Sequence, residues 1–513
     1  MKLIDFVINN TDKYIRTMPK AMRKKYGQFF TSKETAMFMA ELFDISQNKS
    51  ELKILDPGAG SGILSVALIE RLQNIDNIKN INLICYENDA NIIELLRTNL
   101  EWVCTHSKIN LRYTINTKNY ITSQAKEYNK TSNCNQISPK FDIVIGNPPY
   151  MKIPKNSDEA MSMQDICYGA PNLYFLFAAM SLFNLSANGE MVYIIPRSWT
   201  SGAYFTRFRK KFLNECTLQH IHLFVSRNKV FEKEQVLQET IIIKVKKTTE
   251  TPENIEITTS QSNCDFSKLT FFSAPYDTVV SGKDSYVYLV TNSQEVEVLK
   301  LINTWNNTLP NIGLKMKTGL TVDFRNQELL RNSLESQSVP LFYSQHIQDG
   351  KVKFPIGKDN EYILTKKSGL LQENKNYLFV KRFTAKEEHR RLQCGVYLSR
   401  IYPEYKIIST QNKINFICGK DNISECTTYG LYVIFNSILY DRYYRILNGS
   451  TQVNSTEINS MPIPPIDIIE KMGKELIKTK DLSENSCEKI LRSFIYDQNR
   501  RSENDINRIE CAS

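Results

Sequence analysis

The stretch LKILDPGAGSGILSVALIERL, residues 52–72, joins a short apolar segment, a turn with three glycines and a second apolar run. The first segment has the length and composition of a buried strand, and the run from Ile63 has helical spacing. Gly58, Gly60 and Gly62 let the backbone of the turn approach a ligand closely, and the start of the helix offers unpaired NH groups. The stretch therefore predicts a ligand-binding turn between a strand and a helix.

Strand-like and helix-like segments alternate through the first half of the chain. The expected strands are LKIL, INLICYE, FDIVIG, GEMVYIIP and ETIIIKVKK, and the expected helices are GILSVALIERL, ANIIELLRTNLEWV, NLYFLFAAMSLFNL and YFTRFRKKFLNE. Strands separated by helices of this length indicate a mostly parallel sheet with helices on both faces. We predict a Rossmann-like, doubly wound α/β domain.

The length of the chain indicates more than one domain, because 513 residues exceed an ordinary single core. Residues 247–265, rich in Thr, Ser, Asn and Glu, are typical of a connector or a peripheral strand. From about residue 311 the βα alternation is lost, and short strand-like pieces rich in Tyr, Phe, Lys and Arg take over. We predict an α/β catalytic domain over residues 1–260, a connector over 261–310, and a mixed α+β domain with a C-terminal helical tail over 311–513.

Composition narrows the class of protein. The net charge of +10 favours a polyanionic partner, and the eleven cysteines form no CxxC pair, which argues against a zinc site or a disulfide framework. The longest apolar runs, such as LYFLFAAMSLF, are shorter than the roughly 20 residues of a membrane span. The N-terminus has no sustained apolar region typical of a secretory signal. We expect a cytoplasmic protein without a metal site.

The glycine turn favours one cofactor among three. No Lys follows Gly62, as a nucleoside triphosphate loop requires, and the spacing is GxGxG rather than the GxGxxG of dinucleotide sites. Glu87, at the end of the second strand, can accept both hydroxyls of a ribose, and Asp56 is placed near a cationic group or the turn amides. S-adenosylmethionine, which has one adenosine, a cationic tail and no phosphate, fits better than NAD.

The stretch FDIVIGNPPY, residues 141–150, ends a later strand at the edge where open α/β sheets bind ligands. The exocyclic amine of adenine is a poor nucleophile, so a catalyst must accept hydrogen bonds from it. The side-chain oxygen of Asn147 and the carbonyl of Pro148 can each accept one, Pro149 helps to fix the backbone, and Tyr150 can stack on the base. The four residues predict methyl transfer to an amino nitrogen, with catalysis by orientation and electrostatics.

DPGAGSG and NPPY, preceded by KYGQFFTSKETAMFMAELF, resemble the γ-class N6-adenine DNA methyltransferases of type II restriction-modification systems, in the BsuBI/PstI-like group. KTGLTVDFR, VKRFTAKEEHRRL and LNGSTQVNSTEINSMPIPP extend the resemblance into the second half. It implies a class I methyltransferase fold that uses S-adenosylmethionine, followed by a target-recognition domain.

The resemblance also implies roles for single residues. Phe30 and Thr31 are expected to close the methionine end of the cofactor pocket, and Phe231 to contact the extruded adenine. Asn119 and Tyr120 stand where the family usually has Asp-Phe for the cofactor adenine. The predicted cofactor set is therefore Phe30, Thr31, Asp56, Gly58, Ala59, Gly60, Gly62, Glu87, Asn119 and Tyr120.

The implied substrate is an adenine in double-stranded DNA, which must be flipped out of the helix. Basic residues in RFRKKF and KRFTAKEEHRR are candidates for phosphate contacts: Arg207, Lys210, Lys381, Arg382, Arg390 and Arg391. We expect a monomer that protects DNA from a cognate restriction endonuclease, and the resemblance suggests a palindromic six-base site, CTGCAG.

Three other functions are compatible with parts of the sequence. A protein glutamine N5-methyltransferase shares NPPY but has its extra domain before the glycine turn, unlike this chain. A restriction enzyme with a fused nuclease is disfavoured because fewer than 30 residues precede GQFFT and the chain has no Pro-Asp dipeptide. A DNA-binding module without catalysis is disfavoured by the intact glycine turn and NPPY.

Overall fold

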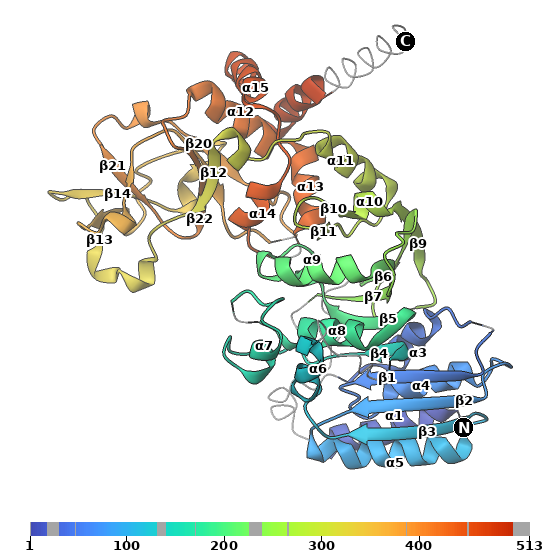
Figure 1. Cartoon of the computed structure of the whole chain (residues 1–513). Coiled ribbons are helices and arrows are strands. Elements are labelled where there is room, and N and C mark those ends of the chain that lie inside the picture. The colour runs from blue at the N-terminus through green and yellow to red at the C-terminus, as the bar shows by residue number, and fades with distance from the viewer. Residues whose placement is uncertain are drawn as a thin grey trace, which may run out of the picture. The chain divides into compact units, whose positions relative to one another are not determined.

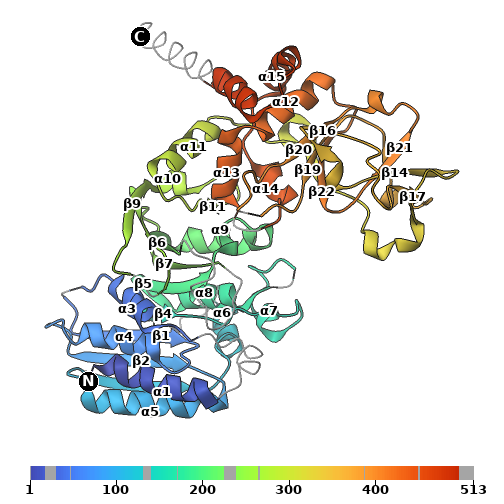
Figure 2. The same ribbon diagram turned by 180° about the vertical axis from the view of Figure 1, so that it is seen from behind.

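The computed structural model describes residues 2–17, 30–46, 48–130, 140–169, 171–224, 239–263, 266–385, 387–448 and 451–495 (Figures 1 and 2). The chain forms two compact units, Met1–Asn292 and Ser293–Ser513. Among the described helices, none combines the length and the apolar character needed to cross a bilayer.

A nine-stranded sheet forms the centre of the first unit, with the order β3-β2-β1-β4-β5-β7-β6-β8-β9. The strands are β1 (Glu51–Pro57), β2 (Asn80–Tyr86), β3 (Asn110–Asn116), β4 (Phe141–Gly146), β5 (Leu185–Pro196), β6 (Thr217–Phe224), β7 (Thr240–Lys246), β8 (Asn254–Ser260) and β9 (Thr270–Pro275). β1 to β5 are parallel, β7 lies antiparallel between β5 and β6, and β9 is antiparallel to β8. The predicted doubly wound, mostly parallel sheet is confirmed.

Helices cover this sheet on both faces. They are α1 (Leu3–Thr17), α3 (Lys33–Glu41), α4 (Ile63–Leu72), α5 (Ala90–His106), α6 (Ala125–Lys130), α7 (Asp158–Ser162), α8 (Leu173–Asn184), α9 (Thr206–Glu215) and α10 (Tyr276–Val279). α1 contacts both α4 and α5, and the three helices lie together beside β1 to β3 (Figures 1 and 2). Phe6 of α1 stacks on Trp102 of α5, with ring centroids 4.0 Å apart, so α1 is part of the core of this unit.

The structure adds elements that the sequence pattern does not predict. β3 carries polar residues on its partly exposed face, and β6 contains the buried polar residues Thr217, His220 and His222, so neither sequence shows the apolar run expected of a parallel strand. The region 261–310, expected as a connector, contains β9 of the large sheet, the hairpin strands β10 (Val280–Ser281) and β11 (Tyr286–Val287), and helix α11 (Ser293–Asn303). The division between the two units falls inside this region, between Asn292 and Ser293.

The second unit is built from two mixed sheets and several helices. The six-stranded sheet has the order β12-β22-β19-β20-β16-β15 and the five-stranded sheet the order β13-β17-β14-β21-β18. The strands are β12 (Leu314–Thr318), β13 (Leu330–Arg331), β14 (Ser338–Phe342), β15 (Ile347–Gln348), β16 (Lys351–Val352), β17 (Tyr362–Leu364), β18 (Gln372–Glu373), β19 (Tyr377–Lys381), β20 (Cys394–Tyr397), β21 (Ile407–Thr410) and β22 (Ile414–Gly419). The helices after α11 include α12 (Glu425–Phe435), α13 (Ile438–Leu447), α14 (Ser455–Ser460) and α15 (Ile466–Thr479), and residues 484–495 are also helical.

Aromatic side chains join the two sheets of the second unit. Phe342 of β14 lies with its ring centroid 5.7 Å from that of Phe379 on β19 and 5.1 Å from that of Tyr397 on β20. All three residues are fully buried. The aromatic residues that mark this half of the sequence therefore form its core.

Candidate active site

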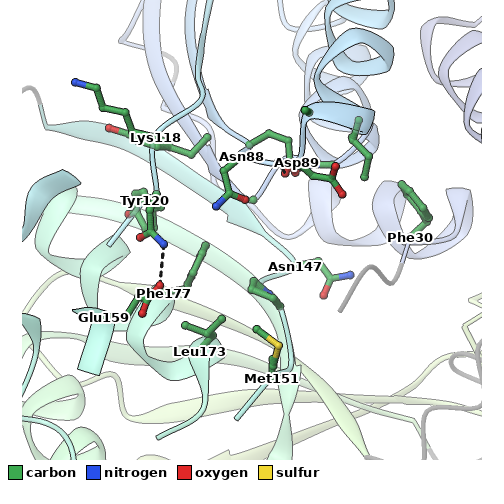
Figure 3. Close-up of a pocket in the computed structure, with 18 residues that line it drawn as sticks. Phe30, Asn88, Asp89, Lys118, Tyr120, Asn147, Met151, Glu159, Leu173 and Phe177 are labelled. Carbon is green, nitrogen blue, oxygen red and sulfur yellow. Dashed lines mark hydrogen bonds between the residues drawn. The ribbon is translucent and has the colours of Figure 1, made fainter. Parts of the chain in front are cut away.

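A pocket of about 500 Å³ opens at the carboxyl ends of the parallel strands of the first unit (Figure 3). It is lined by Phe30, Gly58, Gly60, Tyr86, Glu87, Asn88, Asp89, Ala90, Ile92, Lys118, Asn119, Tyr120, Asn147, Pro149, Met151, Glu159, Leu173 and Phe177. The parallel arrangement of β1, β2 and β4 brings the glycine turn, the acid after β2 and the NPPY stretch to one edge. Eight of the predicted cofactor and catalytic residues therefore line this pocket, namely Phe30, Gly58, Gly60, Glu87, Asn119, Tyr120, Asn147 and Pro149, whereas Thr31, Asp56, Ala59, Gly62, Pro148 and Tyr150 are not among the lining residues.

The backbone of the glycine turn adopts a conformation that favours glycine at three positions. Gly58, Gly60 and Gly62 have φ angles of 77°, 55° and 85°, which side chains rarely allow. A Cβ at Gly62 would also lie 2.9 Å from a methyl carbon of Leu96 in α5. The amides of Gly58 and Ala59 both donate to the carbonyl of Tyr86, at 2.8 and 2.9 Å. The turn is thus fastened to the end of β2.

Glu87 completes this fastening from the end of β2. One carboxylate oxygen accepts from the Gly60 amide and the other from the Asp89 amide, each at 2.9 Å. Burial raises the pKa of Glu87 above its usual value, and the hydrogen bonds that it accepts from backbone amides oppose that rise. Each oxygen of a carboxylate has a second lone pair, so Glu87 can bind ligand hydroxyls while it holds the turn.

Asp56 is fully buried at the end of β1. Its Oδ2 accepts from the Ser65 hydroxyl at 2.6 Å, while Oδ1 has no hydrogen-bond partner in the described part of the chain. Burial raises the pKa of Asp56 to about 7. Asp56 is not one of the residues that line the pocket, so its contact with a cationic group of the cofactor stays a prediction.

Asn147 follows β4 directly, with its amide held at both ends. Its Nδ2 donates to the Thr31 hydroxyl at 3.1 Å, and its Oδ1 lies 2.8 Å from the Tyr150 hydroxyl, which donates to it. The preceding Gly146 is required because a Cβ there would lie 2.6 Å from the ring of Tyr193. The predicted pocket residue Asn147 therefore presents a fixed carbonyl oxygen, as Figure 3 shows at one end of the pocket.

The other residues of NPPY have different environments. Pro149 lines the pocket, whereas Pro148 is buried beside it. The Tyr150 hydroxyl is also 2.9 Å from the carbonyl of Ile194, and burial raises the pKa of this phenol well above its usual value. Tyr150 therefore keeps its single hydroxyl hydrogen at neutral pH and shares it between Oδ1 of Asn147 and the carbonyl of Ile194. It thereby helps to orient Asn147, a role that the sequence does not predict. Stacking of Tyr150 on a base stays a prediction.

Asn119 and Tyr120 follow β3 and line the pocket, and their contact with the cofactor adenine stays a prediction. Tyr120 is anchored by hydrogen bonds of its hydroxyl with Ser181 and Asn184, at 3.1 and 3.0 Å. Asn119 donates from Nδ2 to Glu159 of α7 at 2.9 Å (Figure 3). Asn119 is therefore paired with a carboxylate inside the pocket.

Several lining residues escape the sequence analysis. Leu173 and Phe177 come from one face of α8, and Glu159, Met151, Asn88 and Lys118 come from loops and a short helix. The i, i+4 spacing of Leu173 and Phe177 near the start of a helix that follows NPPY is a signal that points to the first two. Nothing in the local sequence singles out Glu159.

The basic residues expected at DNA fall into two groups. Arg207 and Lys210 are exposed on α9, and Lys381 and Arg382 are partly exposed after β19. By contrast, Arg391 is fully buried and donates to Thr384 and Asn448.

The prediction that Arg391 contacts phosphate is wrong, because its guanidinium is enclosed by its own unit. Arg390 is also engaged by the fold, since it donates to the carbonyls of Phe435 and Ser437 and pairs with Glu484 at 3.0 Å. Phe231 lies outside the described residues.

The strand order, with β7 antiparallel between β5 and β6, and the pocket at the carboxyl edge define a class I methyltransferase. The model of the Eco57I restriction-modification methylase family matches residues 71–231. The solved structure of the type IIL restriction-modification enzyme MmeI in complex with DNA aligns with 96% of this chain and 74% of its own, at a TM-score of 0.53 and 11% identity. That likeness concerns the fold.

Two curated relatives match almost end to end. The chain is 34% identical over 477 residues to the type II methyltransferase M.PstI of Providencia stuartii, covering 90% of this chain and 91% of the relative. It is also 34% identical over 482 residues to the type II methyltransferase M.BsuBI of Bacillus subtilis, covering 92% and 94%. The chain belongs to the type II methyltransferases of restriction-modification systems, in the BsuBI/PstI-like group.

Proposed function

We propose that this protein transfers a methyl group from S-adenosylmethionine to N6 of an adenine in a short site of double-stranded DNA. The modification would protect that site from a cognate restriction endonuclease. The observation that carries the proposal is the fixed oxygen of Asn147, held by Tyr150 at the end of a pocket that can contain a nucleoside. An amine whose lone pair is delocalised into a ring needs such an acceptor.

The residues of the pocket fit S-adenosylmethionine, which supplies an electrophilic methyl group. Glu87 can bind the ribose hydroxyls, because its carboxylate lines the pocket and has about four acceptor sites, more than the backbone amides that donate to it occupy. The unsatisfied, buried Oδ1 of Asp56 is a suitable acceptor for a cationic amino group. Phe30 lies at the same end of the pocket as Asn147, where the methionine part would be held (Figure 3).

Asn147 and Pro148 act on the target amine in this proposal. Oδ1 of Asn147 accepts one N6 hydrogen, and the carbonyl of Pro148 accepts the other. These two bonds orient the nitrogen lone pair toward the methyl group and stabilise the positive charge that develops on nitrogen during attack. The amide of Asn147 needs little reorganisation, since Thr31 and Tyr150 already fix both of its ends.

The candidate phosphate contacts are the exposed Arg207 and Lys210 in the first unit and the partly exposed Lys381 and Arg382 in the second. They agree with a net charge of +10 and with the need to offset the unstacking of a flipped adenine, which costs a few kcal/mol. The second unit, as the candidate target-recognition domain, would contact the site to be methylated. CTGCAG is the candidate site.

Expression in a host that lacks DNA methylation, followed by sequencing that detects modified bases, tests the whole proposal. We expect N6-methyladenine at one short sequence motif. The Asn147→Ala variant, expressed at the same level, serves as the control and is expected to leave that motif unmodified. The absence of N6-methyladenine with the parent protein would overturn the proposed substrate.

A further inference from the structure

Glu159 lies at the end of the pocket opposite Asn147, where it is hydrogen-bonded to Asn119 (Figure 3). It belongs to α7, a short helix that follows the NPPY stretch and is capped by the Ser157 hydroxyl. Ala160, its neighbour in α7, is fully buried, so the backbone that carries Glu159 is fixed to the rest of the unit. A carboxylate is therefore held at the far end of a nucleoside-sized pocket.

The hydrogen bonds of Asn119 fix the polarity of this end. Its Oδ1 accepts from the backbone amides of Ile121 and Thr122, both at 3.0 Å, which is possible only for the oxygen of the amide group. Its Nδ2 therefore points to Glu159 and donates to Oε1 at 2.9 Å. The pocket thus contains a donor from Asn119 and an acceptor from Glu159 side by side.

We infer that Asn119 and Glu159 together recognise the adenine ring of the cofactor. The inference rests on the proposed function, because it places the adenosine of S-adenosylmethionine in this pocket. With the ribose at Glu87 and the methyl group at Asn147, the adenine falls at the third position, next to Glu159. Glu159 accepts a hydrogen bond from the exocyclic amine, and Nδ2 of Asn119 donates to the adjacent ring nitrogen.

This arrangement reverses the role expected for Asn119. The resemblance places Asn119 where the family usually has an Asp for the cofactor adenine, and the oxygen of an Asn could accept from the exocyclic amine in the same way, but that oxygen is already used by two backbone amides. Glu159, from a different element, supplies the acceptor instead. A negatively charged acceptor also discriminates against bases with a keto oxygen at the same position, because two acceptors would face each other without a proton.

Binding of the cofactor product and of its inosine analogue tests the inference without methyl transfer. S-adenosylhomocysteine has the exocyclic amine, whereas S-inosylhomocysteine has a keto oxygen and a protonated ring nitrogen in its place. Isothermal titration of the full-length protein is expected to show a preference for the adenosyl compound of about tenfold or more. Glu159→Ala is expected to weaken binding of the adenosyl compound by about tenfold and to leave the inosyl compound nearly unchanged.

A matched control and a conservative variant sharpen this test. Asp158→Asn removes an acid one residue away that does not line the pocket, and it is expected to keep the parental preference. Glu159→Gln retains the shape and is expected to shift the preference toward the inosyl compound, because an amide can donate to the keto oxygen. Methylation by Glu159→Ala is expected to show a raised KM for S-adenosylmethionine with kcat within about twofold of the parent.

The outcomes separate this inference from the proposed function. A parent protein that methylates adenine while Glu159→Ala and Glu159→Gln both keep its preference would overturn the role of Glu159 alone. A parent protein that binds neither compound and methylates no DNA would overturn the proposed function as well. Thermal unfolding of each variant identifies any loss of folding, and the conservative Glu159→Gln then decides the result.

Discussion

The two ends of the pocket contain the same side chain in opposite orientations. At one end, Nδ2 of Asn147 donates a hydrogen bond to Thr31, and its Oδ1 faces the hydroxyl of Tyr150. At the other end, Oδ1 of Asn119 accepts hydrogen bonds from two backbone amides, and its Nδ2 donates one to Glu159. One amide is prepared to accept, and the other to donate.

The difference shows that neighbours decide what an asparagine does. Asn147 follows β4 and is oriented by the hydroxyls of Thr31, which is distant in the sequence, and of Tyr150, three residues further on. Asn119 is oriented by the amides of the two residues that follow Tyr120. The acceptor end suits an interaction that strengthens as charge develops during reaction, and the donor end suits recognition of a ground-state ring. Substitutions at the two ends should therefore change different kinetic constants.

The largest expected effect is that of Asn147→Ala. Loss of its oxygen is expected to lower the single-turnover rate of methyl transfer by about a thousandfold, because the acceptor acts mainly in the transition state. Binding of S-adenosylhomocysteine, measured by titration, is expected to stay within about twofold of the parent. Asn119→Ala provides the opposite case, with weaker binding and a nearly unchanged rate at saturation. A similar loss of rate in both variants would contradict the division of roles.

The next largest expected effect concerns the buried carboxyl group of Asp56, which makes the free energy of unfolding depend on pH. In the folded state Asp56 has a pKa of about 7, against a usual value of 3.8. Between pH 4 and pH 7 the folded protein therefore holds a proton on Asp56 that the unfolded chain has lost. Raising the pH through this window therefore destabilises the parent protein, by about 1.4 kcal/mol per pH unit at most. The penalty is complete above pH 7.

Asp56→Asn cannot titrate and tests this prediction directly. The unfolding free energy of the variant minus that of the parent, from denaturant titrations without cofactor, is expected to rise between pH 4 and pH 7 and to level off above it. The variant amide can still accept from Ser65, so the bond to α4 is preserved. A difference that is independent of pH would show that Asp56 titrates normally.

The sequence predicts the part of the site that is encoded in consecutive residues. The glycine turn, Glu87 and Asn147 follow strands at the same edge of a parallel sheet, so their meeting follows from the βα alternation. Glu159 cannot be predicted in this way, because its place in the pocket depends on the path of a loop and a short helix. A lone acid in a polar stretch has no periodicity that would distinguish it from the surface.

The environments of the basic residues also could not be predicted from the sequence. Arg390 and Arg391 look like surface cations in KEEHRRL, yet the fold uses both to satisfy carbonyls and side chains within the second unit. Their partners lie at residues 384, 435, 437 and 448, at the ends of other elements. Charge alone does not reveal whether an arginine faces water, since its five donors can be fully used in a core.

Tyr150→Phe is expected to give the smallest effect and the sharpest test of how Asn147 is oriented. Removing the hydroxyl takes away one hydrogen bond to Oδ1 and leaves the ring in place, so the single-turnover rate is expected to fall by about five- to tenfold. Tyr174→Phe is the matched control, because that hydroxyl bonds to Ser198 instead. If Tyr150 served only to stack on the target base, the ring of Phe would suffice and the rate would equal that of the parent. A loss confined to Tyr150→Phe would therefore assign the hydroxyl, and not the ring, to the positioning of the acceptor.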